Sequence, residues 1–469
     1  MNEKRGMSLA LLAFANLITS LDFTIVYVAL PDIAREVGFT PHSLQWVVSA
    51  YAVLFGGFLL LGGRLADLVG RRRMFAAGLS LYGVGSLLGG LAPSPALLIV
   101  ARMLQGLGGA ILAPATLSLV NTMFPAGSAR TRALTVWATG GAAGLSLGSL
   151  LGGALTNWLG WQWVFFVNVP LALIGLALAP GLLVADGARE RGRTFDLPGA
   201  LTGTAGVTLL VFAVAQGPEA GWTSTPVIVS ALLAAALLAA FLMVEKRSSS
   251  PLMPLRLFGN RSLSAAAVVI LVFGLTLQAI PYFLTLYFQG VLGFTALQTG
   301  VAFLGPTLSI TFGNTISERL IGRLGTRTTL IAGILAGAAG SALLGPGMTA
   351  DGSYLTVLAG IVVVGLGMGL IYPAMFNAVG SGVDGSEQGT ASGIANTALQ
   401  VGSGAGLAVL VAVANAGLGG LSGEALRAAT ADGLAVAAYV AAAGSLLGVL
   451  AALRLPGLSR TPVLAEDSV

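Results

Sequence analysis

The sequence contains no cysteine and a single histidine, His42. Disulfide bonds and thiol chemistry are therefore excluded, and so is a metal site built from several histidines. Only 9% of the 469 residues are charged and 56% are hydrophobic, whereas a soluble chain has about a quarter of its residues charged. The composition identifies an integral membrane protein, and we expect no metal site.

Two further features are missing. No G-x-x-x-x-G-K-[ST] phosphate loop is present, so we expect no ATP hydrolysis and no enzyme activity. The apolar run after residues 1–6 is too long for the apolar region of a signal peptide, so no cleavable signal is expected. The net charge of +5 comes from the placement of the arginines and does not indicate nucleic-acid binding.

Long apolar runs take the place of these features. A helix needs about 20 apolar residues to cross a bilayer. The sequence predicts fourteen such spans, near residues 7–30, 43–62, 74–92, 96–119, 133–155, 163–184, 199–217, 226–244, 263–288, 298–316, 328–346, 354–376, 391–415 and 434–453.

The distribution of basic residues supports this count. With the N-terminus in the cytoplasm and fourteen crossings, 20 of the 23 Lys and Arg residues fall in cytoplasmic segments. Arg35 and Arg427 fall outside, and Arg102 lies within a span. This bias is the positive-inside rule. We therefore predict an all-α membrane protein with both termini in the cytoplasm.

Two polar cytoplasmic connections, residues 185–198 and 245–262, flank one pair of spans and divide the chain into six, two and six. We predict an N-terminal six-helix bundle (1–184), a linker with two extra spans (185–262), a C-terminal six-helix bundle (263–455) and a cytoplasmic tail (456–469). Two six-helix halves with a substrate site between them are the arrangement of major facilitator transporters.

A glycine pair, one acid, a third glycine and an arginine block join the second and third spans. This stretch resembles the signature loop G-x-L-A-D-x-x-G-R-R of the major facilitator superfamily. The matching residues are Gly63, Leu65, Ala66, Asp67, Gly70, Arg71 and Arg72, and Leu68 stands at a usually basic position. The resemblance implies a cytoplasmic gate in which Asp67 and the arginines pair with neighbouring helix ends. A degenerate copy lies at residues 318–327, where Gly322 replaces the acid.

Asp22 is the only acid well inside a span, nine residues before Pro31 or about 13 Å of helix. A charge at a helix centre costs about 2.5–3.5 kcal/mol, so such an acid is a candidate functional group. Arg102, the only base in a span, lies about 9 Å from the start of its helix, at a depth similar to that of Asp22. We therefore expect the two side chains to pair.

Sequence around both residues resembles the drug:proton antiporters with fourteen helices. The segment from Leu21 to Pro31 resembles the motif of their first helix, with Tyr27 where Asn is most frequent. The segment from Arg102 to Ala110 resembles their R-x-x-Q-G-x-G-x-A motif, which is assigned to proton transfer. The resemblance implies that Asp22 and Arg102 couple proton movement to transport, with the proton gradient in place of a cofactor.

Glycines recur every four residues in the fifth span, which leaves a bare stripe for close helix packing. The stripe also resembles the antiporter motif G-x-x-x-G-P-x-x-G-G, aligned at Gly144, Gly148, Gly152 and Gly153, with Ser149 in place of the proline. Further segments resemble the same family, among them residues 161–170, 195–199, 287–293 and 389–406. The resemblance covers residues 8–455.

Polar and aromatic residues within the spans are candidates for the wall of a substrate cavity. They are Gln105, Trp137, Gln278, Tyr282, Tyr287, Tyr372, Asn377, Asn396 and Gln400. For each of them alone, helix packing or an interfacial position is the alternative reading. An apolar cavity with few charges suits a bulky, lipophilic substrate.

The family resemblance implies proton-coupled efflux of lipophilic drugs or natural products by alternating access, in the bacterial cytoplasmic membrane and as a monomer. The expected partners are a small lipophilic substrate, protons and membrane lipid. Two alternatives remain: a proton symporter for a small metabolite, which Ser149 favours, and a membrane sensor that keeps the fold without transport. The identity of the substrate and the role of residues 199–244 do not follow from the sequence.

Overall fold

The computed structural model describes residues 3–40, 43–124, 128–186, 196–248, 251, 253, 255–381, 383 and 387–456. All regular secondary structure in these ranges is helical, as the composition predicts. The first half of the chain forms α1 (Glu3–Val37), α2 (Trp46–Val69), α3 (Arg71–Gly90), α4 (Pro95–Met123), α5 (Ser128–Leu159), α6 (Trp163–Phe166) and α7 (Asn168–Leu182).

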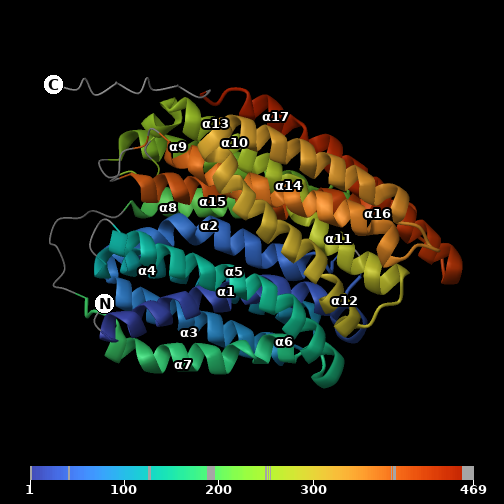
Figure 1. Ribbon diagram of the computed structural model, residues 1–469, viewed down its shortest axis with the longest axis horizontal. Helices are drawn as coiled ribbons and strands as arrows, with labels where there is room; N and C mark the ends of the chain where they lie inside the picture. Colours follow the sequence, from blue (N-terminus) through green and yellow to red (C-terminus); the bar gives the residue numbers. More distant parts are fainter. Residues whose placement is uncertain are drawn as a thin grey trace, which may run out of the picture.

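Two long helices follow, α8 (Leu197–Ala220) and α9 (Thr225–Arg247). The second half forms η1 (Leu255–Gly259), α10 (Arg261–Leu275), η2 (Leu277–Ala279), α11 (Ile280–Leu286), η3 (Tyr287–Val291), α12 (Ala296–Ala302), α13 (Leu304–Gly347), α14 (Tyr354–Gly380), α15 (Gln388–Ala414), α16 (Gly423–Ser445) and α17 (Leu447–Ala452). In Figure 1 the first half, in blue to green, lies below the second half, in yellow to red.

Ten helices of the described residues are long and apolar enough to cross a membrane, judged by length and composition. Shorter apolar helical stretches at Trp46–Leu59 and Pro198–Val214 add to them. Each predicted span overlaps helical structure over most of its length, and one of the ten helices, Ala296–Gly347, holds two predicted spans. The number of crossings and the side on which the termini lie stay predictions.

The structure corrects the detail of several spans. The predicted span 263–288 is interrupted at Thr276, which has φ −124° and ψ −82°. The break between the predicted spans at 298–316 and 328–346 is a single non-helical residue, Gly325, with φ 80° inside α13. Helix α16 begins at Gly423, eleven residues before the predicted start of the last span at 434. Apolar runs set where helices lie, whereas single residues with unusual dihedrals set where they break.

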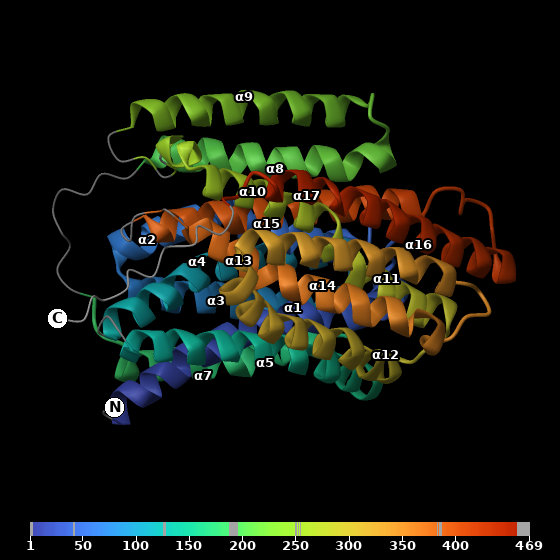
Figure 2. The ribbon, with the colours of Figure 1, turned by 45° about the horizontal axis from the view of Figure 1, so that its top comes forward.

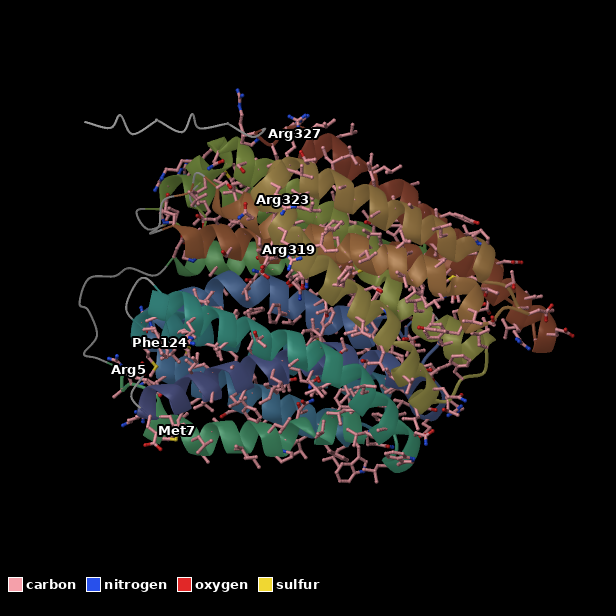
Figure 3. The ribbon with its side chains drawn as sticks, in the orientation of Figure 1. Arg5, Met7, Phe124, Arg319, Arg323 and Arg327 are labelled. Carbon is pink, nitrogen blue, oxygen red and sulfur yellow. The ribbon has the colours of Figure 1, made fainter. Side chains whose placement is uncertain are left out.

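Hydrogen bonds between the ends of helices mark the two ends of the molecule. At one end, Ser8 Oγ donates to the Leu182 carbonyl at 2.7 Å, which brings the start of α1 to the end of α7 and near Gly70; we call this the Gly70 end. At the other end, Trp161 Nε1 donates to Glu36 Oε2 at 2.9 Å; we call this the Trp161 end. Figure 3 labels Arg5, Met7 and Phe124 at the Gly70 end.

The two halves are joined toward the Trp161 end. One apolar core contains residues of both halves, such as Leu30 and Val47 from the first and Phe288 from the second. A second core, which includes Leu12, Phe75 and other residues toward the Gly70 end, belongs to the first half. The described residues therefore show the halves in contact at the Trp161 end, with separate packing toward the Gly70 end.

Helices α8 and α9 pack against each other, and α8 lies against both α2 and α15. Thr204 Oγ1 in α8 donates to the Gly57 carbonyl of α2 at 2.8 Å, and the rings of Trp46 and Phe212 lie 6.0 Å apart. Figure 2 shows α9 outermost, with α8 between α9 and the rest of the molecule. The extra pair thus covers the seam between α2 and α15.

Candidate functional site

Asp22 and Arg102 form a buried ion pair. Asp22 is 0% exposed and Arg102 is 2% exposed, and Arg102 Nη1 donates to Asp22 Oδ2 at 2.6 Å. The pairing that we expected from their similar depth is present. Because an isolated charge is costly in a low-dielectric interior, each side chain offers the other a compensating partner there.

Two side-chain amides bond the carboxylate, and Ser86 bonds one of them. Gln105 Nε2 donates to Asp22 Oδ1 at 3.1 Å and to Ser86 Oγ at 2.8 Å. Asn168 Nδ2 donates to the same Asp22 Oδ1 at 3.1 Å. We call Asp22, Ser86, Arg102, Gln105 and Asn168 the Asp22 cluster; it joins α1, α3, α4 and α7.

Arg102 has further partners of its own. Its Nε donates to the Val47 carbonyl of α2 at 2.7 Å, and its Nη1 also donates to Gln105 Oε1 at 2.9 Å. The guanidinium carbon lies 4.6 Å from the centre of the Tyr51 ring, within the range of a cation–π contact. The guanidinium is therefore held even without the carboxylate.

Local sequence explains how four helices approach so closely. Arg102 and Gln105 are three residues apart, so they share one face of α4. A Cβ at Gly85 of α3 would lie 2.9 Å from both Gln105 Cγ and the Gln105 backbone nitrogen. The missing side chain is what lets Gln105 reach Ser86 and Asp22.

Asn168 is not among the predicted site residues, although it lies within the family-like segment 161–170. It is 0% exposed. Its Nδ2 bonds Asp22 and the Val164 carbonyl, whereas its Oδ1 has no hydrogen-bond partner among the described residues. A buried acceptor without a partner is uncommon, and this one belongs to a side chain that bonds the central carboxylate.

The loop with the signature pattern turns at Gly70, whose φ of 117° favours glycine. The backbone N–H groups of Arg72 and Arg73 donate to the Asp186 carboxylate at 2.9 and 3.1 Å. An acid at a helix N-terminus is favourable because it accepts from free N–H groups. From the sequence, Asp186 belongs only to the predicted linker, and no pattern marks it as a partner of this loop.

Other predicted gate residues give less information. Gly63 lies in α2, where an added Cβ would be 3.6 Å from Pro114 Cβ. The side chain of Asp67 lies outside the described part of the chain, so its predicted pairing stays a prediction. Arg71 and Arg72 are half-buried at the start of α3.

The glycine stripe of α5 contacts two different partners. Added Cβ atoms would lie 3.0 Å from Leu21 N at Gly144, 2.5 Å from Leu21 O at Gly148 and 2.7 Å from Ile25 O at Gly152, all in α1. At Gly153 a Cβ would instead lie 2.7 Å from the Ala296 carbonyl of α12. Gly153 therefore packs the first half against the second.

The candidate cavity residues lie at several places. Gln105 belongs to the Asp22 cluster. Tyr287 donates to the Gly347 carbonyl at 2.9 Å, at the Trp161 end, whereas Asn377 Oδ1 accepts from Thr326 at 2.8 Å, near the opposite end of α14. Asn396 Nδ2 donates to Ser392 within α15.

The remaining candidates differ in exposure and partners. Tyr372 is 44% exposed and Tyr282 is 1% exposed, and Gln278 is half-buried. The Trp137 indole nitrogen and the Tyr282 hydroxyl have no partner among the described residues. Gln400 lies against Gly56 of α2, at a contact between the halves. Their role as a substrate wall stays a prediction.

A helical membrane protein of two halves, with a buried ion pair in the first half, is the class that fold and site define. Residues 12–407 match the family model of the Major Facilitator Superfamily, and the chain belongs to this family. It is therefore a multi-span transporter of the bacterial cytoplasmic membrane and not an enzyme.

Similar curated proteins include the Puromycin resistance protein pur8 of Streptomyces alboniger, 41% identical over 87% of this chain and 82% of that protein. The Cephamycin export protein CmcT of Amycolatopsis lactamdurans is 41% identical over 89% and 86%. The Lincomycin resistance protein of Streptomyces lincolnensis is 36% identical over 88% and 85%.

Among solved structures, the fold is similar to that of an auto-inhibited POT family peptide transporter. The TM-score is 0.68, and the match covers 97% of this chain and 98% of that one at 18% sequence identity. At this identity the similarity concerns the fold alone.

Proposed function

We propose that the protein exports lipophilic drugs or natural products from the cytoplasm in exchange for protons. The names of the similar proteins, which refer to resistance to or export of puromycin, cephamycin and lincomycin, support export of natural products. The observation that supports proton coupling is the buried Asp22–Arg102 ion pair. Asp22 is titratable, and protonation of its carboxylate would change the contacts among four helices.

In this proposal the Gly70 end faces the cytoplasm and the chain crosses the membrane fourteen times. The placement of Arg5 and of the Arg71–Arg73 block at that end supports this orientation through the positive-inside rule. The arginines Arg319, Arg323 and Arg327 of α13 (Figure 3) follow the same pattern. The structure then corresponds to the state that is closed toward the outside.

The coupling step begins when a proton from the outside binds the Asp22 carboxylate. Asp22 loses its charge, and Arg102 keeps the Val47 carbonyl, Gln105 and the Tyr51 ring. The ion pair that ties α1 to α4 is thereby weakened while α4 stays tied to α2. Such a differential change is what a ligand needs to shift a conformational equilibrium, and here the ligand is the proton.

The test uses purified protein in proteoliposomes with an imposed pH gradient and a dye for internal pH, while lipophilic cations and neutral antibiotics are added. We expect proton movement opposite to the substrate in the native chain and none in Asp22→Asn. Asp32→Asn is the matched control, since Asp32 lies on the same helix ten residues further on and outside the Asp22 cluster; it should keep the exchange.

Each alternative gives a different result. Movement of protons and substrate in the same direction would make the protein a symporter, as the Ser149 substitution favours. Exchange that persists in Asp22→Asn would place the proton site elsewhere. No proton movement with any compound in the native protein would leave the sensor as the better interpretation.

A further inference from the structure

A side-chain amide of the second half bonds the backbone of α1. Gln289 Nε2 donates to the Val28 carbonyl at 2.7 Å, close to the Trp161 end, where the two halves meet. We propose that Gln289 is a latch that holds the halves closed at this end and positions α1 for the proton reaction. The inference rests on the alternating access of the proposed function.

Gln289 lies on a turn of unusual geometry. Residues Tyr287–Val291 form the π-helical turn η3, and the Leu292 N–H donates to the Tyr287 carbonyl, five residues back, at 2.9 Å. A π-turn holds one more residue than an α-turn, which changes the direction in which its side chains point, and such turns are frequent at functional sites. Here the turn presents Gln289 to the other half.

The neighbours of Gln289 are fixed within their own half. The Tyr287 hydroxyl donates to the Gly347 and Thr349 carbonyls at 2.9 and 3.1 Å. The ring of Phe288, which is 0% exposed, stacks on Phe294 at 5.7 Å between centroids. The base of Gln289 is therefore rigid, and its amide reaches across from a fixed point.

The acceptor lies on the helix that carries the proton site. Val28 is 1% exposed and follows Asp22 by six residues, about 9 Å along α1. Because this part of α1 is a continuous helix, a displacement at Asp22 moves the Val28 carbonyl as well. The latch thus joins the Asp22 cluster to the contact between the halves.

Opening of the Trp161 end separates Gln289 from Val28 and exposes both groups to water. Since a typical hydrogen bond contributes a modest net free energy, its loss should raise the ratio of open to closed molecules by about 2- to 10-fold. A latch of this size keeps one end closed without preventing the transport cycle.

The experiment measures the distance between the halves at this end. Because the chain has no cysteine, spin labels attach only to cysteines introduced at exposed Ala96 and Asp351, one in each half. Pulsed electron resonance on the purified full chain, without substrate or gradient, gives the fraction of molecules at the longer distance. Gln289→Met, which keeps the length but lacks the N–H donor, should raise the ratio of long to short distances by 2- to 10-fold.

Gln162→Met is the matched control, because Gln162 lies at the same end within the first half; it should leave the ratio unchanged. Gln289→Asn retains the amide but is one methylene too short to reach, so it should resemble Gln289→Met, and it covers the case in which Met impairs folding. An unchanged ratio in both Gln289 variants overturns the latch. Absence of proton exchange by the native protein in the liposome assay, while the Gln289 variants shift the distances as expected, would instead contradict the proposed function.

Discussion

Asp22 and Arg102 are 80 residues apart in sequence, and both are almost fully buried. Removal of either partner leaves the other as an uncompensated buried charge. Asn168 and Gln105 reduce the free-energy cost of removing Arg102, because they still donate to the carboxylate. Tyr51 and Val47 reduce the cost of removing Asp22, because they still contact the guanidinium. The stability of the pair is therefore best measured as a difference between single and double variants.

We expect Asp22→Asn and Arg102→Met each to destabilise the protein, by up to about 3–5 kcal/mol, because each breaks a buried pair. The double variant should be more stable than the Arg102→Met variant, since no unpaired charge remains in it. Thermal unfolding of the purified proteins, followed by tryptophan fluorescence, measures the effect. Destabilisation of the double variant by the sum of the two single effects would contradict a direct pairing.

Among single residues, the sequence predicted the charged members of the site, because a charge within an apolar span is easy to recognise. A lone acid and a lone base in apolar spans have a clear cost, and counting residues along each helix gave their depths. Asn168 carries no charge, so its presence in a span has no comparable signal. Asp186 was hidden because it lies in a polar connection, where an acid is ordinary.

Single glycines decide the geometry of the turns between helices. Gly70 has φ 117°, and an added Cβ would collide with the Asp186 side chain. Gly325 has φ 80° at the corresponding turn of the second half. Gly322, in the degenerate copy of the loop, has no atom within 4 Å of an added Cβ and lies in regular helix.

Gly70→Ala should destabilise the protein by about 1–3 kcal/mol, through backbone strain at a positive φ together with displacement of Asp186. Gly322→Ala is the matched control and should stabilise α13 by about 0.5–1 kcal/mol, since alanine is the better helix former. Unfolding temperatures of the two variants test the pair. A Gly70→Ala variant as stable as the native chain would show that the turn tolerates a side chain.

The existence of the helices was predictable because apolar runs of the required length are hard to place anywhere but in a membrane. Their breaks were not. The division of the 163–184 span at Val167, between α6 and α7, lies three residues before Pro170, which has no N–H for the Phe166 carbonyl. The π-turn at η3 involves no proline or charge. The π-turn accompanies tertiary contacts, such as the packing of Phe288 on Phe294, that do not appear as a local pattern.

The two halves are related by their order along the chain, and they meet at the Trp161 end through Gln289 and Gly153. Their division at residues 185–198 and 245–262 is a prediction from the polar composition of these connections. The contact between the halves did not follow from the sequence, since it joins ordinary glycine and glutamine residues far apart in the chain.

The proposed orientation predicts which residues reagents reach from outside the cell. Single cysteines at Thr40 and Asp351, both exposed near the Trp161 end, should react with a membrane-impermeant maleimide in intact cells. Cysteines at Arg73 and Gly322 should react only after the membrane is permeabilised. Reaction of the cysteines at Thr40 and Asp351 is the positive control, because it shows that the maleimide is active when the two protected positions do not react. Reaction of Gly322→Cys in intact cells would contradict the fourteen-crossing arrangement.

Helix α8 lies against α2 of one half and α15 of the other, and α9 covers it with an outer face that includes exposed Leu232, Leu233 and Met243. Acyl chains along this side therefore meet α9 instead of the seam between α2 and α15. Changes in lipid composition or membrane thickness reach that seam only through two intervening helices. In the proposed cycle, where the halves move against each other, the pair would therefore separate the α2–α15 seam from the bilayer on this flank.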